Sequence, residues 1–181
     1  FVGDISSSTL GTSNFRAGIN AGNSIQSGGN YNVTVGDEAG TAITTGDDNV
    51  LLGYAAGDAL TTSSRNVAVG YEALSTATAY NENTAVGYRA LKASTDGYSN
   101  TAVGVNSLLA NTTGHSNVAV GHAAGTANTT GVQSTIVGSF AGDALTEGND
   151  NIALGHDALS GDTKGSRSVA IGSNTLKTQN F

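Results

Sequence analysis

Apolar and polar residues follow one another along this chain in a unit of fixed length, and Asn66–Leu74 and Asn83–Leu91 are two nearly identical copies of it. Each copy has branched residues on both sides of an alanine, a pattern that favours a short strand. A glycine, called the repeat glycine below, ends that strand. Successive repeat glycines lie 17 residues apart after a first step of 18. They are Gly18, Gly36, Gly53, Gly70, Gly87, Gly104, Gly121, Gly138, Gly155 and Gly172. A fixed short period predicts an all-β stack of about ten like coils, a parallel β-roll or β-solenoid.

The strand of each unit has one branched face and one thin face. The residues immediately before the repeat glycine and third before it, called the branched positions below, share one face and are mostly Val, Ile, Leu or Thr. Between them lies the strand-centre position, which is usually Ala, with Leu51 and Ile136 as larger exceptions. We expect the branched residues to fill a narrow core. The alanine face would let another backbone come close, either a second wall of the same coil or a neighbouring chain. One column of successive coils should contain Val69, Val86, Val103 and Val120.

A single large aliphatic residue follows each strand at one of two places. The fourth residue after the repeat glycine, called the early core position, is Leu in half of the units and Gly in the others. Where it is Gly, an aliphatic residue usually stands three residues later, at the late core position, and only Asn128 breaks this rule. A displacement of three residues predicts a single helical or 3₁₀ turn that returns both side chains to one interior column. Leu74 and Leu91 should therefore occupy the same column as Leu60 and Leu145.

Asparagine and glycine mark the bends. The fourth residue before the repeat glycine is Asn or Ser, whose side chain bonds nearby backbone groups in turns and can form a ladder between stacked coils. The repeat glycine itself predicts a positive φ or close packing at the strand end. A second glycine seven residues earlier marks another bend. It is found as Gly29, Gly46, Gly97, Gly114, Gly131, Gly148 and Gly165.

Composition agrees with a stack of turns. The chain has 26 Gly and no Pro, Cys, Met or Trp, so disulfides and thiol chemistry are absent. Its net charge of -7 comes from dispersed acids, and we expect neither nucleic-acid binding nor membrane insertion. Residues 1–13 precede the regular period and are interpreted as a connection, whereas residues 14–181 form the repeat domain. A chain that starts at Phe1 is interpreted as part of a longer protein.

Candidate chemistry is sparse. His122 and His156 share a repeat position two coils apart, which is too far for a shared metal within one chain. The acidic pairs Asp37-Glu38 and Asp47-Asp48 are explained better as solvated turns than as a calcium site. We expect no catalytic residue, metal or cofactor. The surface feature of interest is the three tyrosines that directly follow successive repeat glycines, which predict either a packing ladder or an exposed strip for sugar or protein contact. They are Tyr54, Tyr71 and Tyr88.

The unit Asn-Thr/Val-Ala-Val-Gly-Tyr-x-Ala-Leu, with Thr-Thr-Gly in its loop, resembles the repeat of many phage tail-fibre and bacterial surface-fibre proteins. Its variant Ser168–Gly172 is similar to the head repeat of YadA-type trimeric adhesins, which is usually shorter. The resemblance covers Asn14 to Leu176. It implies a left-handed parallel β-roll, three chains side by side and a role in attachment, and it carries over no catalytic residue.

These observations predict a non-enzymatic fibre segment, a spacer with a surface that contacts a host glycan or protein receptor. The carrier would be a viral tail fibre of the virion or, alternatively, the head domain of an extracellular bacterial adhesin. Two other classes compete. A polysaccharide depolymerase should gather acids in a groove, and an ice-binding solenoid should show flat Thr-x-Thr arrays, whereas here acids are dispersed and Thr-Thr pairs lie in bends. Because each coil offers a small core, we expect a parallel homotrimer. The candidates for its close contact are Ala68, Ala85, Ala102 and Ala119, unless this column faces the interior of the roll, an alternative that the spacing leaves open.

Overall fold

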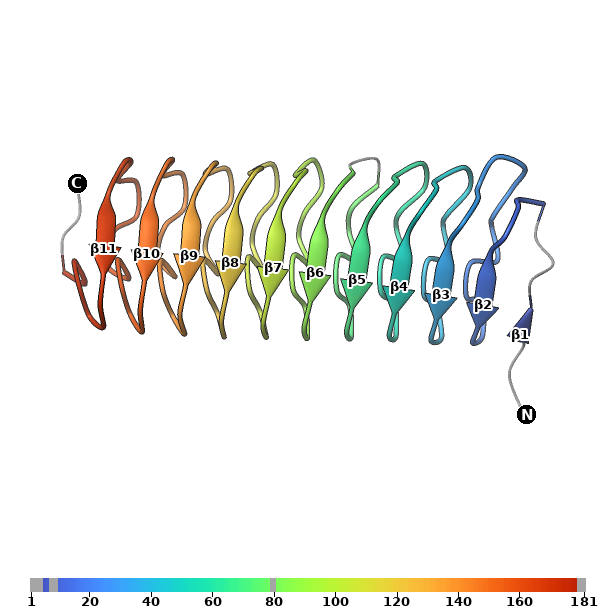
Figure 1. Cartoon of the computed structure of the whole chain (residues 1–181), viewed down its shortest axis with the longest axis horizontal. Helices are drawn as coiled ribbons and strands as arrows, with labels where there is room; N and C mark the ends of the chain where they lie inside the picture. Colours follow the sequence, from blue (N-terminus) through green and yellow to red (C-terminus); the bar gives the residue numbers. More distant parts are fainter. Residues whose placement is uncertain (1–4, 7–9, 79–80, 179–181) are drawn as a thin grey trace.

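The computed structural model describes residues 5–6, 10–78 and 81–178 and shows a β-solenoid with one short strand in each coil (Figure 1). Ten strands are parallel, and the eleventh, β1 (Ile5–Ser6), pairs antiparallel with the first of them. The parallel strands are β2 (Phe15–Ala17), β3 (Val33–Val35), β4 (Val50–Leu52), β5 (Val67–Val69), β6 (Thr84–Val86), β7 (Thr101–Val103), β8 (Val118–Val120), β9 (Thr135–Val137), β10 (Ile152–Leu154) and β11 (Val169–Ile171). The predicted all-β stack is confirmed.

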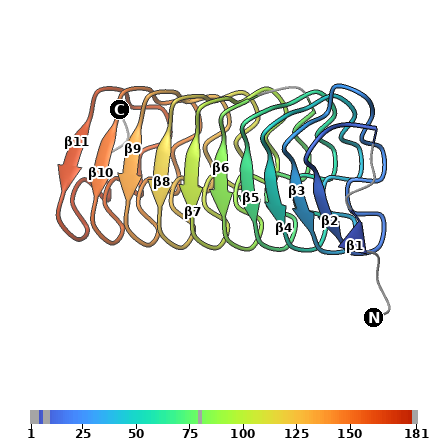
Figure 2. The ribbon, with the colours of Figure 1, turned by 45° about the vertical axis from the view of Figure 1, so that its right-hand side comes forward.

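The register of the sheet follows the sequence period without a slip. Each strand pairs with the equivalent residues of the next coil, so that Val69 lies beside Val86, which lies beside Val103. Val103 in turn lies beside Val120, and the predicted valine column is therefore confirmed. The strands follow one another along the rod in chain order, with no crossover (Figure 2).

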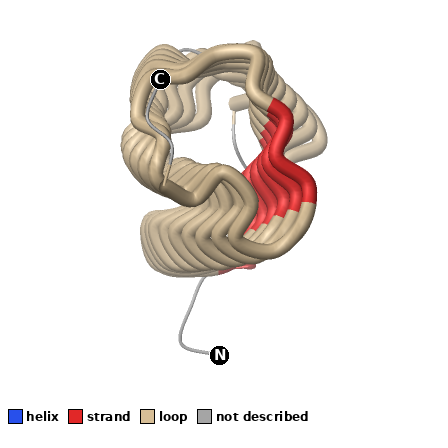
Figure 3. Tube along the Cα trace, turned by 90° about the vertical axis from the view of Figure 1, so that its left-hand side faces the viewer, coloured by secondary structure: helices blue, strands red, loops and turns tan. Residues whose placement is uncertain are grey.

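The strand faces are the reverse of the predicted arrangement. The strand-centre residues point inward and are buried, including Leu51, Ala85 and Ile136, whereas the flanking branched residues such as Val67 and Val69 are half exposed. The physical reason is the small cross-section of the coil. An interior bounded by a wall on every side (Figure 3) has room for alanine at most strand centres and for one larger aliphatic residue in most coils, and two further branched columns would overfill it.

The segment after each strand consists of two successive turns, and none of the described residues forms a helix. In one representative coil, the Ala90 N–H donates to Gly87 O at 3.3 Å, and the Ser94 N–H then donates to Leu91 O at 3.2 Å. Arg89 and Leu91 have positive φ angles of 55° and 52°, which a right-handed helical or 3₁₀ turn does not contain. The predicted single helical turn is therefore wrong, although the three-residue displacement that suggested it is real.

The early and late core positions do fill one interior column. Leu91 and Leu60 are both fully buried in the same hydrophobic cluster. A Cβ atom built on Gly57, the early core position of its coil, would lie 2.8 Å from Leu60 Cδ1 and 2.8 Å from Leu51 Cδ2. The late-position leucine thus occupies the space that an early-position leucine would use. The prediction of a shared column is confirmed.

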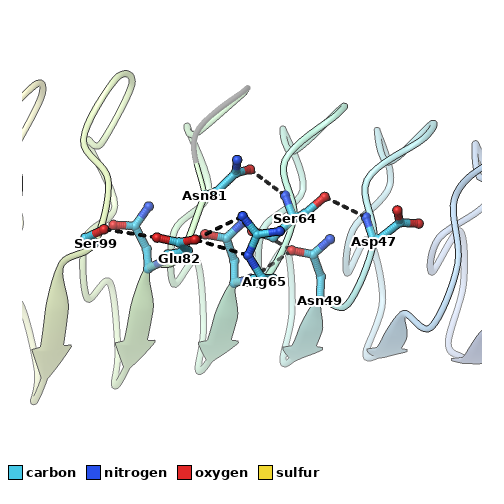
Figure 4. Close-up of polar contacts among 9 residues, drawn as sticks. Asp47, Asn49, Ser64, Arg65, Asn81, Glu82 and Ser99 are labelled. Carbon is cyan, nitrogen blue, oxygen red and sulfur yellow. Dashed lines mark hydrogen bonds and ion pairs between the residues drawn. The ribbon is translucent and has the colours of Figure 1, made fainter.

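A ladder of buried asparagines joins the coils at the bend before each strand (Figure 4). Asn49 is representative: its Oδ1 accepts from the Asn66 N–H at 3.0 Å, and its Nδ2 donates to Asn32 Oδ1 at 2.9 Å and to Ser63 O at 2.8 Å. Beside this ladder runs a more exposed one, in which the Asp47 N–H donates to Ser64 Oγ and the Ser64 N–H to Asn81 Oδ1. The predicted corner role of asparagine is confirmed.

The repeat glycines meet both conditions that the sequence suggested. Gly87 has a φ of 136°, and a Cβ atom added there would lie 2.4 Å from the carbonyl oxygen of Gly104 in the next coil. The glycines of the second bend are needed only because neighbouring atoms lie close to them, and not for a positive φ. Gly46, for example, has no positive φ, but an added Cβ atom would lie 2.2 Å from Ser63 O.

Candidate contact surface

The outward face of the sheet is an apolar wall that runs the length of the rod. Because the strand-centre side chains fill the interior, the branched positions on either side of them face outward from every parallel strand. Val118 and Ile152 are each 38% exposed, and the corresponding residues of the central coils are half buried. The alanines expected at a chain contact, Ala68 and Ala85 among them, are fully buried inside the coil and cannot touch a neighbouring chain. The surface available for such a contact is the branched wall.

The three tyrosines form a stacked row beside this wall. Ring centroids of Tyr54 and Tyr71 lie 5.3 Å apart with an angle of 17° between the planes, and those of Tyr71 and Tyr88 lie 5.3 Å apart at 13°. The residues are nonetheless 41–50% exposed. The two sequence interpretations, packing ladder and exposed strip, thus describe the same row. Its inner ring faces are covered by neighbouring rings, so the outward surface consists mainly of ring edges.

A charged cluster lies at one end of the tyrosine row. The Arg89 guanidinium lies 5.0 Å from the Tyr88 ring centroid and donates from Nε to Glu72 Oε2 at 2.8 Å. Lys92 Nζ lies 2.6 Å from the same oxygen. The hydrogen bond from Lys92 is the main reason that the pKa of Glu72 is lowered, and the bond to Glu72 is the main reason that the pKa of Arg89 is raised. Both groups therefore keep their charge, and the cluster fixes the guanidinium over the row.

A second aromatic group continues along the rod. His122 and His156 do not meet, but Phe140 of the coil between them lies edge-on to both, with centroid distances of 4.9 Å and 6.3 Å. Sequence reasoning missed Phe140 because it stands one residue later in the frame than the histidines do. Tyr98 and His115 form a separate stacked pair at 4.4 Å on the exposed bend before the strand.

The sequence also contains a longer period, which the structure made visible. Ala56–Thr61 recurs as Ala141–Thr146, which begins 85 residues, or five 17-residue coils, further on. The two aspartates within these segments, Asp58 and Asp143, each have a buried Oδ1 with no hydrogen-bond partner among the described residues. Burial raises the pKa of both carboxyls, and the nearby carboxylates Glu72 and Asp157 add to the effect. A comparison of the sequence with itself at this longer spacing could have found the pair.

The salt bridges repeat with the same spacing. Asp157 accepts a hydrogen bond from Lys177 Nζ, as Glu72 does from Lys92, and this bond is the main cause of the lowered pKa of Asp157. In both halves of the array, a half-buried aspartate thus lies near a carboxylate that is neutralised by a lysine of the following coil. The longer period preserves charge pairing as well as core packing.

The other acids considered for calcium act as structural acceptors. Asp37 Oδ1 accepts from the Ile19 N–H at 2.9 Å, and Asp47 Oδ1 accepts from the Asn30 N–H at 2.6 Å. Glu38 Oε1 accepts from Asn20 Nδ2. Each of these three acids therefore bonds the preceding coil. Within the described ranges, no group of three or more His, Asp or Glu side chains is arranged to hold a metal ion.

Comparisons with protein families, with curated proteins and with solved structures found no match to this chain. Among the residues that the structure describes, no helix has the length and apolar character needed to cross a membrane.

Proposed function

We propose that this chain is a structural segment of a viral tail fibre, a rigid spacer that works as a parallel homotrimer and contacts the host surface along its tyrosine row. The observation that carries the proposal is the outward apolar wall formed by the branched positions. A strip of half-exposed valine, isoleucine and leucine side chains, with threonine only at Thr84, Thr101 and Thr135 of β3 to β11, is typical of a surface that another protein covers. The resemblance of the repeat to fibre proteins supports the choice of carrier.

Identical copies are the partner that fits such a wall best. Every coil presents the same two branched columns, so parallel copies in register place like residues side by side at every level along the rod. The buried alanines take no part in this contact. Covering the wall would also add apolar burial to a chain whose own core holds one large aliphatic side chain in most coils.

Substitution of the wall tests the homotrimer. We expect the unmodified chain to have about three times its chain mass of 17.9 kDa by light scattering at micromolar concentration. Val86→Glu with Val103→Glu places two carboxylates in neighbouring coils of the wall and should yield a folded monomer. Thr113→Glu, on an exposed bend, is the control and should leave the trimer intact. An unmodified chain that is folded and monomeric would contradict the proposed assembly.

The tyrosine row is proposed to contact a host-surface glycan or protein. Because ring edges rather than open faces point outward, the contact would combine edge packing with hydrogen bonds from the phenols. Binding of the labelled chain to an array of bacterial surface polysaccharides tests the glycan case. Replacing Tyr54, Tyr71 and Tyr88 together by Ser should abolish the signal, whereas the same change at Tyr98, outside the row, should not. Equal binding by both variants would remove the row from the proposal.

A further inference from the structure

The tyrosine row carries a second set of polar groups, the backbone N–H groups of the tyrosines themselves. Among the described residues, none accepts a hydrogen bond from the N–H of Tyr54, Tyr71 or Tyr88. The next N–H along the chain is paired, since that of Arg89 donates to Tyr71 O at 2.9 Å. Three donors in successive coils therefore have no acceptor among the described residues, on a row whose side chains are exposed.

The coil that contains Ile19 shows what a donor at this position binds. Ile19 also directly follows a repeat glycine, and its N–H donates to Asp37 Oδ1 of the next coil at 2.9 Å, on the exposed surface. A carboxylate thus fits the N–H at this position. In the coils of the tyrosine row, the residue that stands where Asp37 would stand is Tyr71, Tyr88 or Val105. None of them has a carboxylate, so the acceptor has to come from outside the chain.

The local charge at the row also favours an anion. Glu72 is bonded by two cations, Arg89 and Lys92, so this cluster holds two positive charges and one negative charge. Among the described residues, Arg89 donates only from Nε, and its two terminal nitrogens keep their N–H groups for another acceptor. At physiological salt, charges further away than about 8 Å are largely screened, so this cluster outweighs the net charge of -7 of the whole chain.

We propose that the ligand of the tyrosine row is an acidic glycan that lies along the rod axis, with its carboxylates bonded to the tyrosine N–H groups and to Arg89. This inference rests on the proposed contact of the row with the host surface and names the chemical class of that contact. A linear polymer suits the row, because the tyrosine rings repeat at 5.3 Å and a sugar residue in an extended β-1,4-linked chain advances by nearly the same length. Hydrogen bonds to a carboxylate are also stronger than those to a neutral hydroxyl.

Paired glycans test the acidic class. Hexamers of β-1,4-linked mannuronate and glucuronate, and the methyl esters of both, would be titrated into the unmodified chain by isothermal titration calorimetry. The ester keeps the sugar and removes the charge. We expect each acid to bind at least about tenfold more tightly than its ester, because the ester loses the charge-assisted bonds. The affinity for the acids should also fall as salt is added.

Val105→Asp tests the N–H donors themselves. It places a carboxylate where it can accept from the Tyr88 N–H, as Asp37 does in its own coil, and it changes no tyrosine. The acidic hexamers should bind this variant about tenfold more weakly, and the esters should bind it as before. Val132→Asp is the charge-matched control, because it adds the same charge on the bend where another coil has Asp47. It should bind both kinds of ligand like the unmodified chain.

Three results would overturn the acidic class. They are equal affinity of the unmodified chain for acids and esters, an unchanged affinity of Val105→Asp for the acids, and an equal loss in both aspartate variants. Should Val105→Asp lose its β circular dichroism, the amide resonance of Tyr88 in the unmodified chain gives the decision, since it should shift with the acids and not with the esters. If no hexamer binds while the polysaccharide array still gives a signal that depends on the row, the acidic class alone fails. If that signal is absent too, the contact of the row fails with it.

Discussion

The coil whose strand ends at Gly87 and the coil whose strand ends at Gly53 bury the same kind of side chain from different places along the chain. The first uses Leu91 at the early core position, and the second uses Leu60 at the late one. The residue at the strand centre also differs: it is Ala85 in the first coil and Leu51 in the second. A small strand centre thus accompanies an early leucine, and a large one accompanies an early glycine. The comparison teaches that one interior column can be filled from either position, and that the strand centre changes with the position used.

The two arrangements carry different backbone costs of similar size. The early core position has a φ of 52° at Leu91 and 58° at Gly57, in the left-handed region in both cases. A leucine there is strained by roughly 1–2 kcal/mol, whereas a glycine avoids the strain but loses about 0.5–1 kcal/mol more conformational entropy on folding. Neither solution has a large advantage, which explains why both recur along one chain.

In a third kind of coil, the interior is filled by side chains of the two adjacent coils. The coil whose strand ends at Gly121 has Ala119 at the strand centre, Gly125 at the early position and Asn128 at the late one, so it supplies no large aliphatic of its own. A Cβ atom built on Gly125 would nevertheless lie 3.0 Å from Leu108 Cδ2 and 3.1 Å from Ile136 Cδ1. Side chains of the coils before and after it fill the space.

Leu91→Ala should have the largest effect on this comparison. It empties the interior of a coil whose strand centre is already alanine, so we expect a loss of about 2–4 kcal/mol in the free energy of unfolding. Urea denaturation followed by circular dichroism measures it. Val105→Ala, at a residue that is 41% exposed, is the control and should cost less than about 0.5 kcal/mol. An equal loss at both positions would mean that the early leucine is not the filling residue.

Gly57→Ala should have the next largest effect, because it adds volume to a coil that the late leucine already fills. The new methyl group would lie 2.8 Å from both Leu51 and Leu60, and we expect a loss of about 1–3 kcal/mol by the same assay. Gly125→Ala is a matched control with nearly the same φ, 59°, and slightly longer contacts. Its loss should be smaller. The reverse order would show that backbone strain rather than packing decides.

Asp58→Asn should give a smaller, pH-dependent gain in the late-leucine coil. Burial raises the pKa of Asp58 in the folded protein above its ordinary value of 3.8, so the folded state holds the proton more tightly than the unfolded one does. Stability is therefore lost as pH rises from that value through the folded pKa. The variant should unfold at a higher temperature than the unmodified chain at about pH 7 and at the same temperature near pH 3. Asp96→Asn, on an exposed bend, should show no such difference, and a gain at both pH values would point to a cause other than titration.

Much of the fold could be predicted from local spacing. The constant interval between repeat glycines sets the register of the sheet, and the compensation between Leu91-type and Leu60-type residues places them in one column. The direction of the strand faces could not be predicted in this way. Alternation separates Ala85 from Val86, but it does not say which of them faces inward, and that depends on a cross-section set by the turns. The turns depend on a left-handed backbone at Arg89 and Leu91. Neither position has a glycine, so the sequence does not indicate this conformation.

The contact surface was predictable in part. The tyrosine row could be predicted from the 17-residue spacing alone. The pairing of Arg89 with Glu72 and the contact of Phe140 with the histidines depend instead on side-chain directions across coils. The buried aspartates Asp58 and Asp143 were within reach of sequence reasoning, because the five-coil period repeats their surroundings. A search limited to the 17-residue period of one coil does not find these aspartates.

A thermodynamic cycle at Leu91 and Ser94, the early and late core positions of one coil, tests the shared interior column most directly. Leu91→Gly, Ser94→Leu and the double variant would each be unfolded in urea. If either position can fill the column, the double variant places a leucine in it from the position that Leu60 uses in its own coil, and the two changes should couple favourably by about 1–3 kcal/mol. The double variant should then be more stable than Leu91→Gly alone. Losses that simply add, with a coupling below about 0.3 kcal/mol, would contradict the account.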